Sequence, residues 1–226
     1  MSFILFGVLP YVCVATFLIG MVRRFRVIRD TVTTGSSQLL EGRLQYWGSV
    51  SWHYAILTVL ALHLWAIVAP GLLGAVLGAP GRLLIVEVTG LALGVTALVG
   101  LSLLVVRRFS LRGETTWLDW LVMALLLVQV ATGVWTSATA RWGYAWLGYV
   151  ATPWLGSIVR LSPQVDRIAV MPHTFHVHVI GAFLLLALVP YTRLAHAIVA
   201  PVEYLWRLPQ VVIWRRPRPA AHRGSR

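Results

Sequence analysis

The chain has 226 residues, of which 58% are hydrophobic and only 12% are charged. Soluble domains are about half apolar and about a quarter charged, so this composition excludes an ordinary soluble protein. The formal net charge of +12 comes from arginines that lie mainly between apolar stretches, so we expect membrane topology signals and no nucleic-acid binding. The single cysteine, Cys13, excludes an internal disulfide, a four-cysteine iron–sulfur site and a thioether-linked haem. We expect Cys13 to be a small, buried apolar residue.

Five apolar stretches are long enough to cross a membrane, which takes about 20 helical residues. Each must be a helix, because lipid offers the backbone no hydrogen-bond partners. The predicted fold class is therefore an all-α membrane protein with five transmembrane helices. In chain order, the predicted spans are Phe3–Val22, Tyr46–Ala69, Leu83–Val106, Leu118–Ser137 and Pro172–Val199.

Arginines concentrate in the first connection, in the third connection and after the fifth span, whereas the second and fourth connections carry few. Because positive charge favours the cytoplasmic side, the N-terminus is predicted outside and the C-terminus in the cytoplasm. The sequence predicts a five-helix domain over residues 1–208 and a basic, proline-rich cytoplasmic tail over residues 209–226, which would contact anionic lipid headgroups or a partner subunit.

The fourth connection, about residues 138–171, is too long for a simple turn. It contains Trp142, Trp146 and Trp154 among apolar residues. Amphipathic aromatic side chains favour the membrane interface, so we expect this segment to lie in the outer interface.

Six of the seven histidines lie in or beside only two spans, the second and the fifth. Ionisable groups inside membrane spans are costly and are functional by default. Two facing helices with two histidines each can bind two stacked haems, with one imidazole on each side of each iron. A four-helix core around two haems is therefore predicted. The histidines are His53 and His63 in the second span and His173, His176, His178 and His196 in the fifth.

Helical geometry selects the ligands in the fifth span. At about 100° per residue, His178 lies a whole number of turns from His196, whereas His176 and His173 fall about 160° and 140° away from that face. Antiparallel helices then pair His53 with His196 near the cytoplasm and His63 with His178 near the outside.

The distances between the histidines along each helix axis agree less well with this pairing. His178 and His196 are about 27 Å apart on an ideal helix, against about 15 Å between His53 and His63. Tilt, ring direction or a kink at Pro190 would have to absorb the difference. The alternative is that these are core histidines hydrogen-bonded between helices. His173 and His176 could form a small outer metal site or be surface imidazoles at the interface.

Over nearly the whole chain, the sequence resembles the gamma subunit of respiratory nitrate reductase, a di-haem cytochrome b. The histidine spacings and the end of the fifth span are the most specific part of the resemblance. The matching residues are Leu9-Pro10-Tyr11, Phe17-Leu18-Ile19-Gly20, Ser36-Ser37-Gln38-Leu39-Leu40, His53 and His63, His178 and His196, Arg193-Leu194-Ala195-His196 and Pro201-Val202-Glu203-Tyr204-Leu205.

The resemblance implies the same ligand pairing, two non-covalent b haems and a bacterial or archaeal cell membrane. It implies that quinol is oxidised near the outer haem and that electrons pass to the inner haem. From there they would reach an iron–sulfur beta subunit at the cytoplasmic face, with the molybdenum catalytic alpha subunit beyond it. The chain alone would not reduce nitrate.

The quinol site is where the sequence departs from the family. Arg82 lies closest to a family lysine that helps to bind quinol, but arginine does not readily lose a proton. Leu62 replaces the glycine that precedes the outer-haem histidine. The candidates for the quinol site are Arg82, Glu87 and His63, and Glu87 could instead be an interfacial carboxylate paired with Arg82.

Two other functions stay open at this stage. A related di-haem anchor could serve a sulfur-metabolising or heterodisulfide-type reductase, which the co-purifying catalytic subunit would distinguish. A haem-free transporter or assembly factor is disfavoured because the sequence has no internal repeat and no broken helices with substrate-binding polar groups.

Overall fold

The computed structural model describes residues 1–27, 43–110, 116–139 and 147–198. The chain divides into two units, Met1–Ala195 and His196–Arg226, and the fold below is that of the first unit. The predicted basic tail, residues 209–226, lies outside the described residues.

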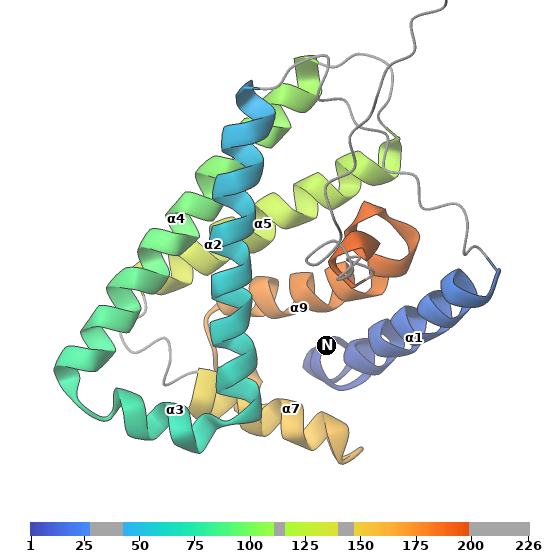
Figure 1. The fold of residues 1–226 in the computed structure, drawn as a ribbon. Helices are drawn as coiled ribbons and strands as arrows, with labels where there is room; N and C mark the ends of the chain where they lie inside the picture. Colours follow the sequence, from blue (N-terminus) through green and yellow to red (C-terminus); the bar gives the residue numbers. More distant parts are fainter. Residues whose placement is uncertain (28–42, 111–115, 140–146, 199–226) are drawn as a thin grey trace, which may run out of the picture. The chain divides into compact units, whose positions relative to one another are not determined.

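Five helices are long and apolar enough to cross a membrane (Figure 1), and the described residues contain no strand. This confirms the predicted all-α fold with five spans. The spanning helices are η1 (Ile4–Val8) continued by α1 (Leu9–Val27), α2 (Arg43–Val68), α4 (Pro80–Ser110), α5 (Trp117–Thr139) and α9 (His173–Leu188). The shorter elements are α3 (Pro70–Leu77), η2 (Leu147–Ala151), α7 (Thr152–Val159), α8 (Asp166–Ala169), η3 (Val189–Tyr191) and η4 (Arg193–Ala197).

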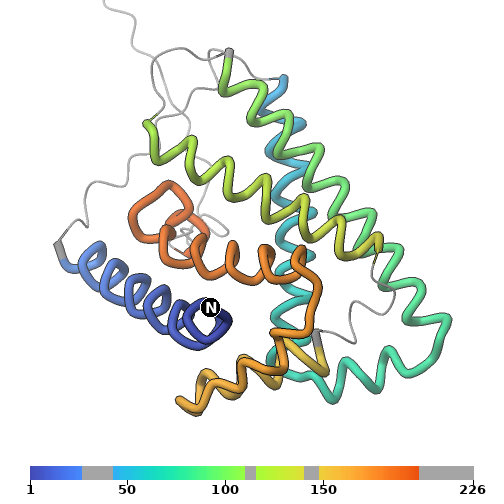
Figure 2. The backbone as a smooth tube through the Cα atoms, turned by 180° about the vertical axis from the view of Figure 1, so that it is seen from behind, coloured from blue at the N-terminus to red at the C-terminus, as the bar shows by residue number. Residues whose placement is uncertain are grey.

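The long helices pack in an order that differs from their order in the chain. α1 contacts α9, α9 contacts α5, α5 contacts α4, and α4 contacts α2 (Figures 1 and 2). The backbones of α2 and α4 approach closely, since a Cβ atom on Gly100 would lie 2.6 Å from the backbone nitrogen of Trp52 and 3.0 Å from the carbonyl oxygen of Gly48. Small residues allow this, and in a membrane close backbone packing is a main source of helix association.

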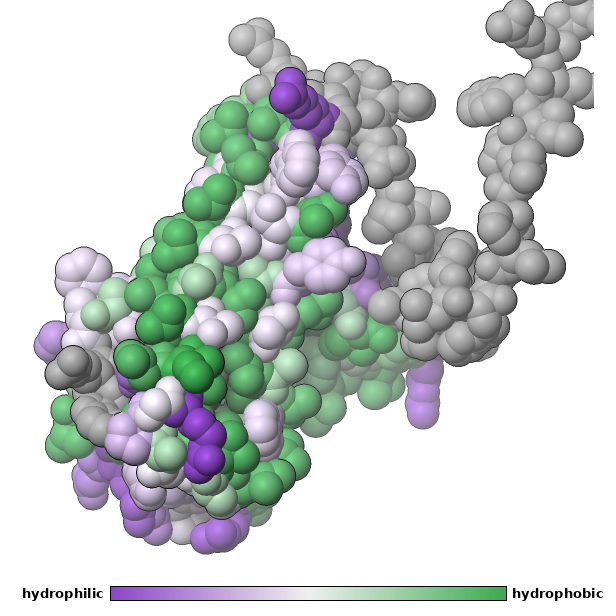
Figure 3. Space-filling view, turned by 60° about the vertical axis from the view of Figure 1, so that its left-hand side comes forward, coloured by the Kyte–Doolittle hydropathy of each residue, from purple (hydrophilic) through white to green (hydrophobic). Residues whose placement is uncertain are grey.

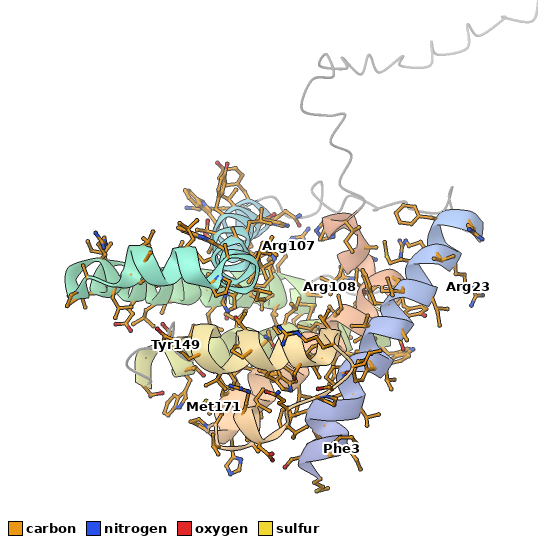
Figure 4. The ribbon with its side chains drawn as sticks, turned by 90° about the horizontal axis from the view of Figure 1, so that it is seen from below. Phe3, Arg23, Arg107, Arg108, Tyr149 and Met171 are labelled. Carbon is orange, nitrogen blue, oxygen red and sulfur yellow. The ribbon has the colours of Figure 1, made fainter. Side chains whose placement is uncertain are left out.

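The outward surface of these helices is strongly apolar. Only 11% of the most apolar stretch of α2 is buried, and hydrophobic side chains cover much of the face seen in Figure 3. An exposed apolar surface of this extent needs lipid around it. Figure 4 shows the basic Arg23, Arg107 and Arg108 toward one side of the unit, away from Phe3 and Met171. The chain is a multi-pass membrane protein.

The fifth spanning helix is shorter than the sequence predicts. α9 ends at Leu188, and the chain continues as the 3₁₀ turn η3 around Pro190 and the extended residue Thr192. The prediction of one continuous helix over residues 172–199 was wrong, because proline has no N–H to donate and its ring clashes with the preceding turn. His178 and His196 therefore do not share the face of one continuous helix, and of the three ways of absorbing the axial difference the structure shows a break at Pro190.

α1 binds the chain at this break. The Arg24 guanidinium donates hydrogen bonds to the carbonyl oxygens of Pro190 (2.7 Å) and Thr192 (3.4 Å). Gly20 lies against the proline ring, and a Cβ atom there would be 2.6 Å from Pro190 Cγ. These contacts satisfy carbonyl groups that a helix ending inside the protein leaves without partners. Arg24 therefore stabilises the broken helix as well as adding to the charge pattern.

The fourth connection folds into the protein around a buried tryptophan. Trp154 is 1% exposed and donates a hydrogen bond from Nε1 to the carbonyl oxygen of Phe6 (3.1 Å). It packs in a cluster with Phe6, Ile158, Ile168 and Phe175. η1 and α9 cover its ring, a burial that the sequence did not predict, and the position of this segment in the outer interface stays a prediction. Trp142 and Trp146 lie outside the described residues, and Cys13, 3% exposed, is buried as predicted.

Candidate functional site

Two of the predicted ligands face each other inside the first unit. The ring centroids of His63 on α2 and His178 on α9 are 6.4 Å apart, and the ring planes are inclined by 38°. Within the described residues α2 and α9 do not pack closely, so these imidazoles meet across a gap between two helix backbones. This is one of the two pairings that the sequence predicts.

The Nδ1 atoms of both imidazoles form hydrogen bonds to backbone carbonyl oxygens. His63 Nδ1 lies 2.8 Å from the carbonyl oxygen of Val59, and His178 Nδ1 lies 3.0 Å from that of Gln129. A carbonyl oxygen can only accept, so each Nδ1 carries a hydrogen, and in the neutral imidazole Nε2 then keeps its lone pair. A histidine that ligates a metal through Nε2 uses its other nitrogen in this way.

The spacing of the two rings suits a bis-histidine iron. A metal-bound imidazole nitrogen lies about 2 Å from the metal, which puts the centroids of two opposed rings roughly 6 Å apart. Gly133 on α5 leaves room for the His178 ring, since a Cβ atom there would be 3.0 Å from its Cε1. The Gln129 amide nitrogen lies 3.3 Å from His178 Nε2, so the Gln129 side chain has to rotate away before Nε2 can bind a metal. No described hydrogen bond of the buried Gln129 Oε1 opposes this rotation. The residues present therefore fit a haem at this position.

His53 has the same local arrangement near the start of α2. Its Nδ1 lies 2.8 Å from the carbonyl oxygen of Ser49 and 3.2 Å from the hydroxyl oxygen of Ser49. The predicted partner, His196, is an exposed residue of η4 and belongs to the second unit. The pairing of His53 with His196 stays a prediction.

The two remaining histidines of α9 are placed differently. His176 Nε2 donates to the carbonyl oxygen of Ile168 (2.8 Å), and its ring lies 4.9 Å from that of Phe6. His173 is exposed, with its ring 5.8 Å from that of His176. The described residues contain no group of three or more metal-binding side chains. His176 therefore ties α9 to α8, and these two residues give no support to an outer metal site.

Two of the three quinol candidates, Arg82 and Glu87, lie near the start of α4, whereas His63 lies on α2. The Arg82 guanidinium donates hydrogen bonds to the carbonyl oxygens of Val76 and Ala75, at the end of the unpredicted helix α3. A cation is favoured there by the helix dipole. Glu87 is partly exposed one turn further along α4. The described hydrogen bonds of Arg82 run to α3 and not to His63.

An ion-pair cluster joins three elements on the side of the molecule where α4 ends. Asp119 of α5 is paired with Arg108 of α4 (3.2 Å) and Arg193 of η4 (3.3 Å). Thr116 and Asp119 also exchange side-chain and backbone hydrogen bonds of 3.1 and 3.2 Å, which cap the start of α5. Asp119 thereby fixes the beginning of η4, three residues before His196.

The comparison with protein families decides the identity of the fold. A family model described as "Nitrate reductase gamma subunit" matches residues 2–215. The chain belongs to this family. The structural features above are therefore those of a gamma subunit.

Individual relatives agree with the family match. The gamma subunit is 33% identical over 218 residues to the respiratory nitrate reductase 1 gamma chain of Escherichia coli, which covers 92% of this chain and 95% of the relative. It is 29% identical to the nitrate reductase gamma chain of Bacillus subtilis, over 94% and 97% of the two chains. It is also 33% identical to the nitrate reductase-like protein NarX of Mycobacterium tuberculosis, where the match covers 88% of this chain and only 32% of the longer relative.

Sequence reasoning missed the contribution of α5. The His178 ring contacts three residues of α5, a helix that carries no predicted ligand. These are Gln129, Thr132 and Gly133. The signal was present, since a glutamine in the middle of an apolar span is costly and unusual. What the sequence does not tell is which helix faces these residues.

Proposed function

We propose that this gamma subunit is the quinol-oxidising, di-haem membrane subunit of a respiratory nitrate reductase. The observation that carries the proposal is the pair His63 and His178, which face each other from α2 and α9 with both Nδ1 atoms bound to carbonyl oxygens. Two neutral imidazoles held in this way are the ligand set of a b-type haem. Histidines that only join helices by hydrogen bonds would not need to face each other with both Nδ1 atoms bound to carbonyl oxygens, an arrangement that leaves Nε2 as the ligand nitrogen of each ring.

The haem ligands follow from this arrangement. His63 and His178 would hold the outer haem, and His53 and His196 the inner one. The haems would supply reversible one-electron transfer between the two membrane faces. The protein residues fix the imidazole tautomers, exclude water from the bundle and keep the ligands on separate helices.

The direction of electron transfer rests on the arginines. Arg23, Arg24 and Arg26 lie in the last turns of α1, and Arg107 and Arg108 in the last turn of α4. By the positive-inside rule these ends are cytoplasmic, so the N-terminus is outside. The iron–sulfur beta subunit would then accept electrons at the end of the molecule where Asp119 lies, with the molybdenum alpha subunit beyond it.

Quinol oxidation would take place at the opposite end, near the outer haem pair. Quinol gives up protons as well as electrons, so the site needs a proton acceptor. Arginine does not readily lose a proton, and Arg82 is bound to the end of α3, which leaves it a hydrogen-bonding role. Glu87 is the proposed acceptor, and His63 would contact the quinol as the outer-haem ligand.

Haem counting in the purified complex tests this proposal. We expect two b haems per chain in a reduced-minus-oxidised spectrum, and the subunits that co-purify should include an iron–sulfur protein and a molybdenum enzyme that reduces nitrate. His63→Ala and His178→Ala should lose the same haem, and His53→Ala and His196→Ala the other. His173→Ala is the matched control on α9 and should keep both. A membrane-inserted chain without haem, or different haems lost in His63→Ala and His178→Ala, would contradict the proposal.

A further inference from the structure

α5 controls one nitrogen of a predicted haem ligand without supplying a ligand itself. His178 Nδ1 lies 3.0 Å from the carbonyl oxygen of Gln129 and 3.2 Å from the hydroxyl oxygen of Thr132. Both groups lie on α5, whereas His178 is on α9. The imidazole is therefore held by a neighbouring helix.

The Thr132 hydroxyl accepts from the imidazole. Its hydrogen is used within α5, because Thr132 Oγ1 donates to the carbonyl oxygen of Val128 at 2.7 Å. Its oxygen lone pairs are then available to His178 Nδ1–H, which is shared between two acceptors. This arrangement fixes the Nδ1–H tautomer and leaves Nε2 as the basic nitrogen.

His53 has an equivalent pair of acceptors. Its Nδ1 lies 2.8 Å from the carbonyl oxygen and 3.2 Å from the hydroxyl oxygen of Ser49. By contrast, the described hydrogen bonds of His63 Nδ1 include only the carbonyl oxygen of Val59, at 2.8 Å. Under the proposed pairing, each haem would thus have one histidine that is held by a carbonyl and a hydroxyl together.

We propose that Thr132 and Ser49 are positioning residues that separately lower the reduction potentials of the outer and inner haem. This inference rests on the proposed function, because it takes His178 and His53 as ligands. Acceptors on Nδ1–H increase the electron density on Nε2, which stabilises the oxidised iron more than the reduced iron. Removing one hydroxyl raises the potential of one haem and leaves the other unchanged.

Potentiometric titration of the two haems in membranes that contain the whole complex tests this inference. Thr132→Val and Thr132→Ala should each favour reduction of the outer haem about threefold, the scale of a modest hydrogen-bond difference, which is a rise of about 30 mV for a one-electron couple. Ser49→Ala should raise only the inner-haem potential. Thr132→Ser keeps the hydroxyl and should titrate like the unaltered protein.

The matched control is Thr136→Val, one turn further along α5. The Thr136 hydroxyl is buried and has no described hydrogen-bond partner, so its removal should shift neither potential. Gly133→Ala should push the His178 ring by a few tenths of an ångström and shift the potential of the outer haem alone, since its Cβ atom would lie 3.0 Å from Cε1.

The outcomes separate this inference from the proposed function. If both haems are present and the Thr132 and Ser49 variants leave their potentials unchanged, the inference fails and the proposed function stands. Equal shifts of both haems in Thr132→Val and Thr136→Val would show general perturbation of the bundle and would also overturn it. If the unaltered protein holds no haem, the proposed function itself fails.

Discussion

The two helices that carry the predicted ligands are built on different principles. α2 is an unbroken helix, and both of its histidines bond through Nδ1 to a carbonyl four residues earlier on the same helix. α9 ends at Leu188, and His178 bonds to the neighbouring α5. Helical periodicity alone therefore orients the imidazoles of α2, whereas tertiary contacts orient those of the fifth span.

The two halves of the site therefore depend on different contacts. The histidines of α2 are oriented by their own helix, so α2 needs only to be held in place in the bundle. Its contact with α4 at Gly48 and Gly100 does this. The fifth span needs a separate contact on each side of its break. α5 holds His178, while Arg24 and Asp119 hold the chain after Leu188.

The largest expected effect comes from separating α2 and α4. In Gly100→Ala the new Cβ atom would lie 2.6 Å from the backbone nitrogen of Trp52, next to His53. Neither backbone can give way cheaply, so we expect the protein to lose about 3 kcal/mol of stability. Unfolding of the solubilised complex by SDS measures this, and the inner haem should be lost before the outer one.

Gly90→Ala is the control for this variant. It lies on the same helix, and a Cβ atom there would have no neighbour within 4 Å. We expect no loss of stability, because alanine is the better helix former. Equal destabilisation by the two changes would show that α2 is not held through Gly100.

A smaller effect is expected at the break in the fifth span. Arg24→Met removes the charged donor from the Pro190 carbonyl oxygen, a bond of 2.7 Å. Charge-assisted hydrogen bonds contribute about 2 kcal/mol, so stability in SDS should fall by this amount. The exposed neighbour Arg23 gives the control variant Arg23→Met. If the Arg23 variant were as unstable as the Arg24 variant, loss of positive charge would explain both.

The smallest effect is expected at the ion pairs before His196. Asp119→Asn keeps an acceptor for the Thr116 N–H but loses the charge that pairs with Arg108 and Arg193. Because Arg193 is more than half exposed, we expect a loss of about 1 kcal/mol that decreases further at high salt. The control is Asp166→Asn, in the first turn of α8. A salt-independent loss at Asp119 would contradict an electrostatic role.

Much of the fold was predictable because membrane spans leave a strong local signal. The five spans follow from apolar length, and the ends of α2, α4 and α5 differ from their predictions by only a few residues. The burial of Cys13 followed from its apolar surroundings. The ligand pair His63 and His178 also comes together, although the angular argument that selected His178 assumed a continuous helix.

The contacts that the sequence did not predict occur where one segment meets another that is distant in the sequence. Trp154 was expected at the membrane interface, and the structure adds that η1 and α9 bury it. Arg24 was interpreted as a topology signal, but it also binds the Pro190 carbonyl oxygen. Hydropathy and spacing describe one helix at a time and contain no information about which helices become neighbours.

The number of spans, the concentration of histidines on two of them, the weak point at Pro190 and the tautomers that a helix imposes on its own residues all follow from the sequence. That α1 and α5 bind the two sides of the break, and that Thr132 contacts His178, depends on the tertiary structure. The physical reason is that helical hydrogen bonds connect residues four positions apart, whereas the contacts that hold the fifth span connect residues more than 40 positions apart.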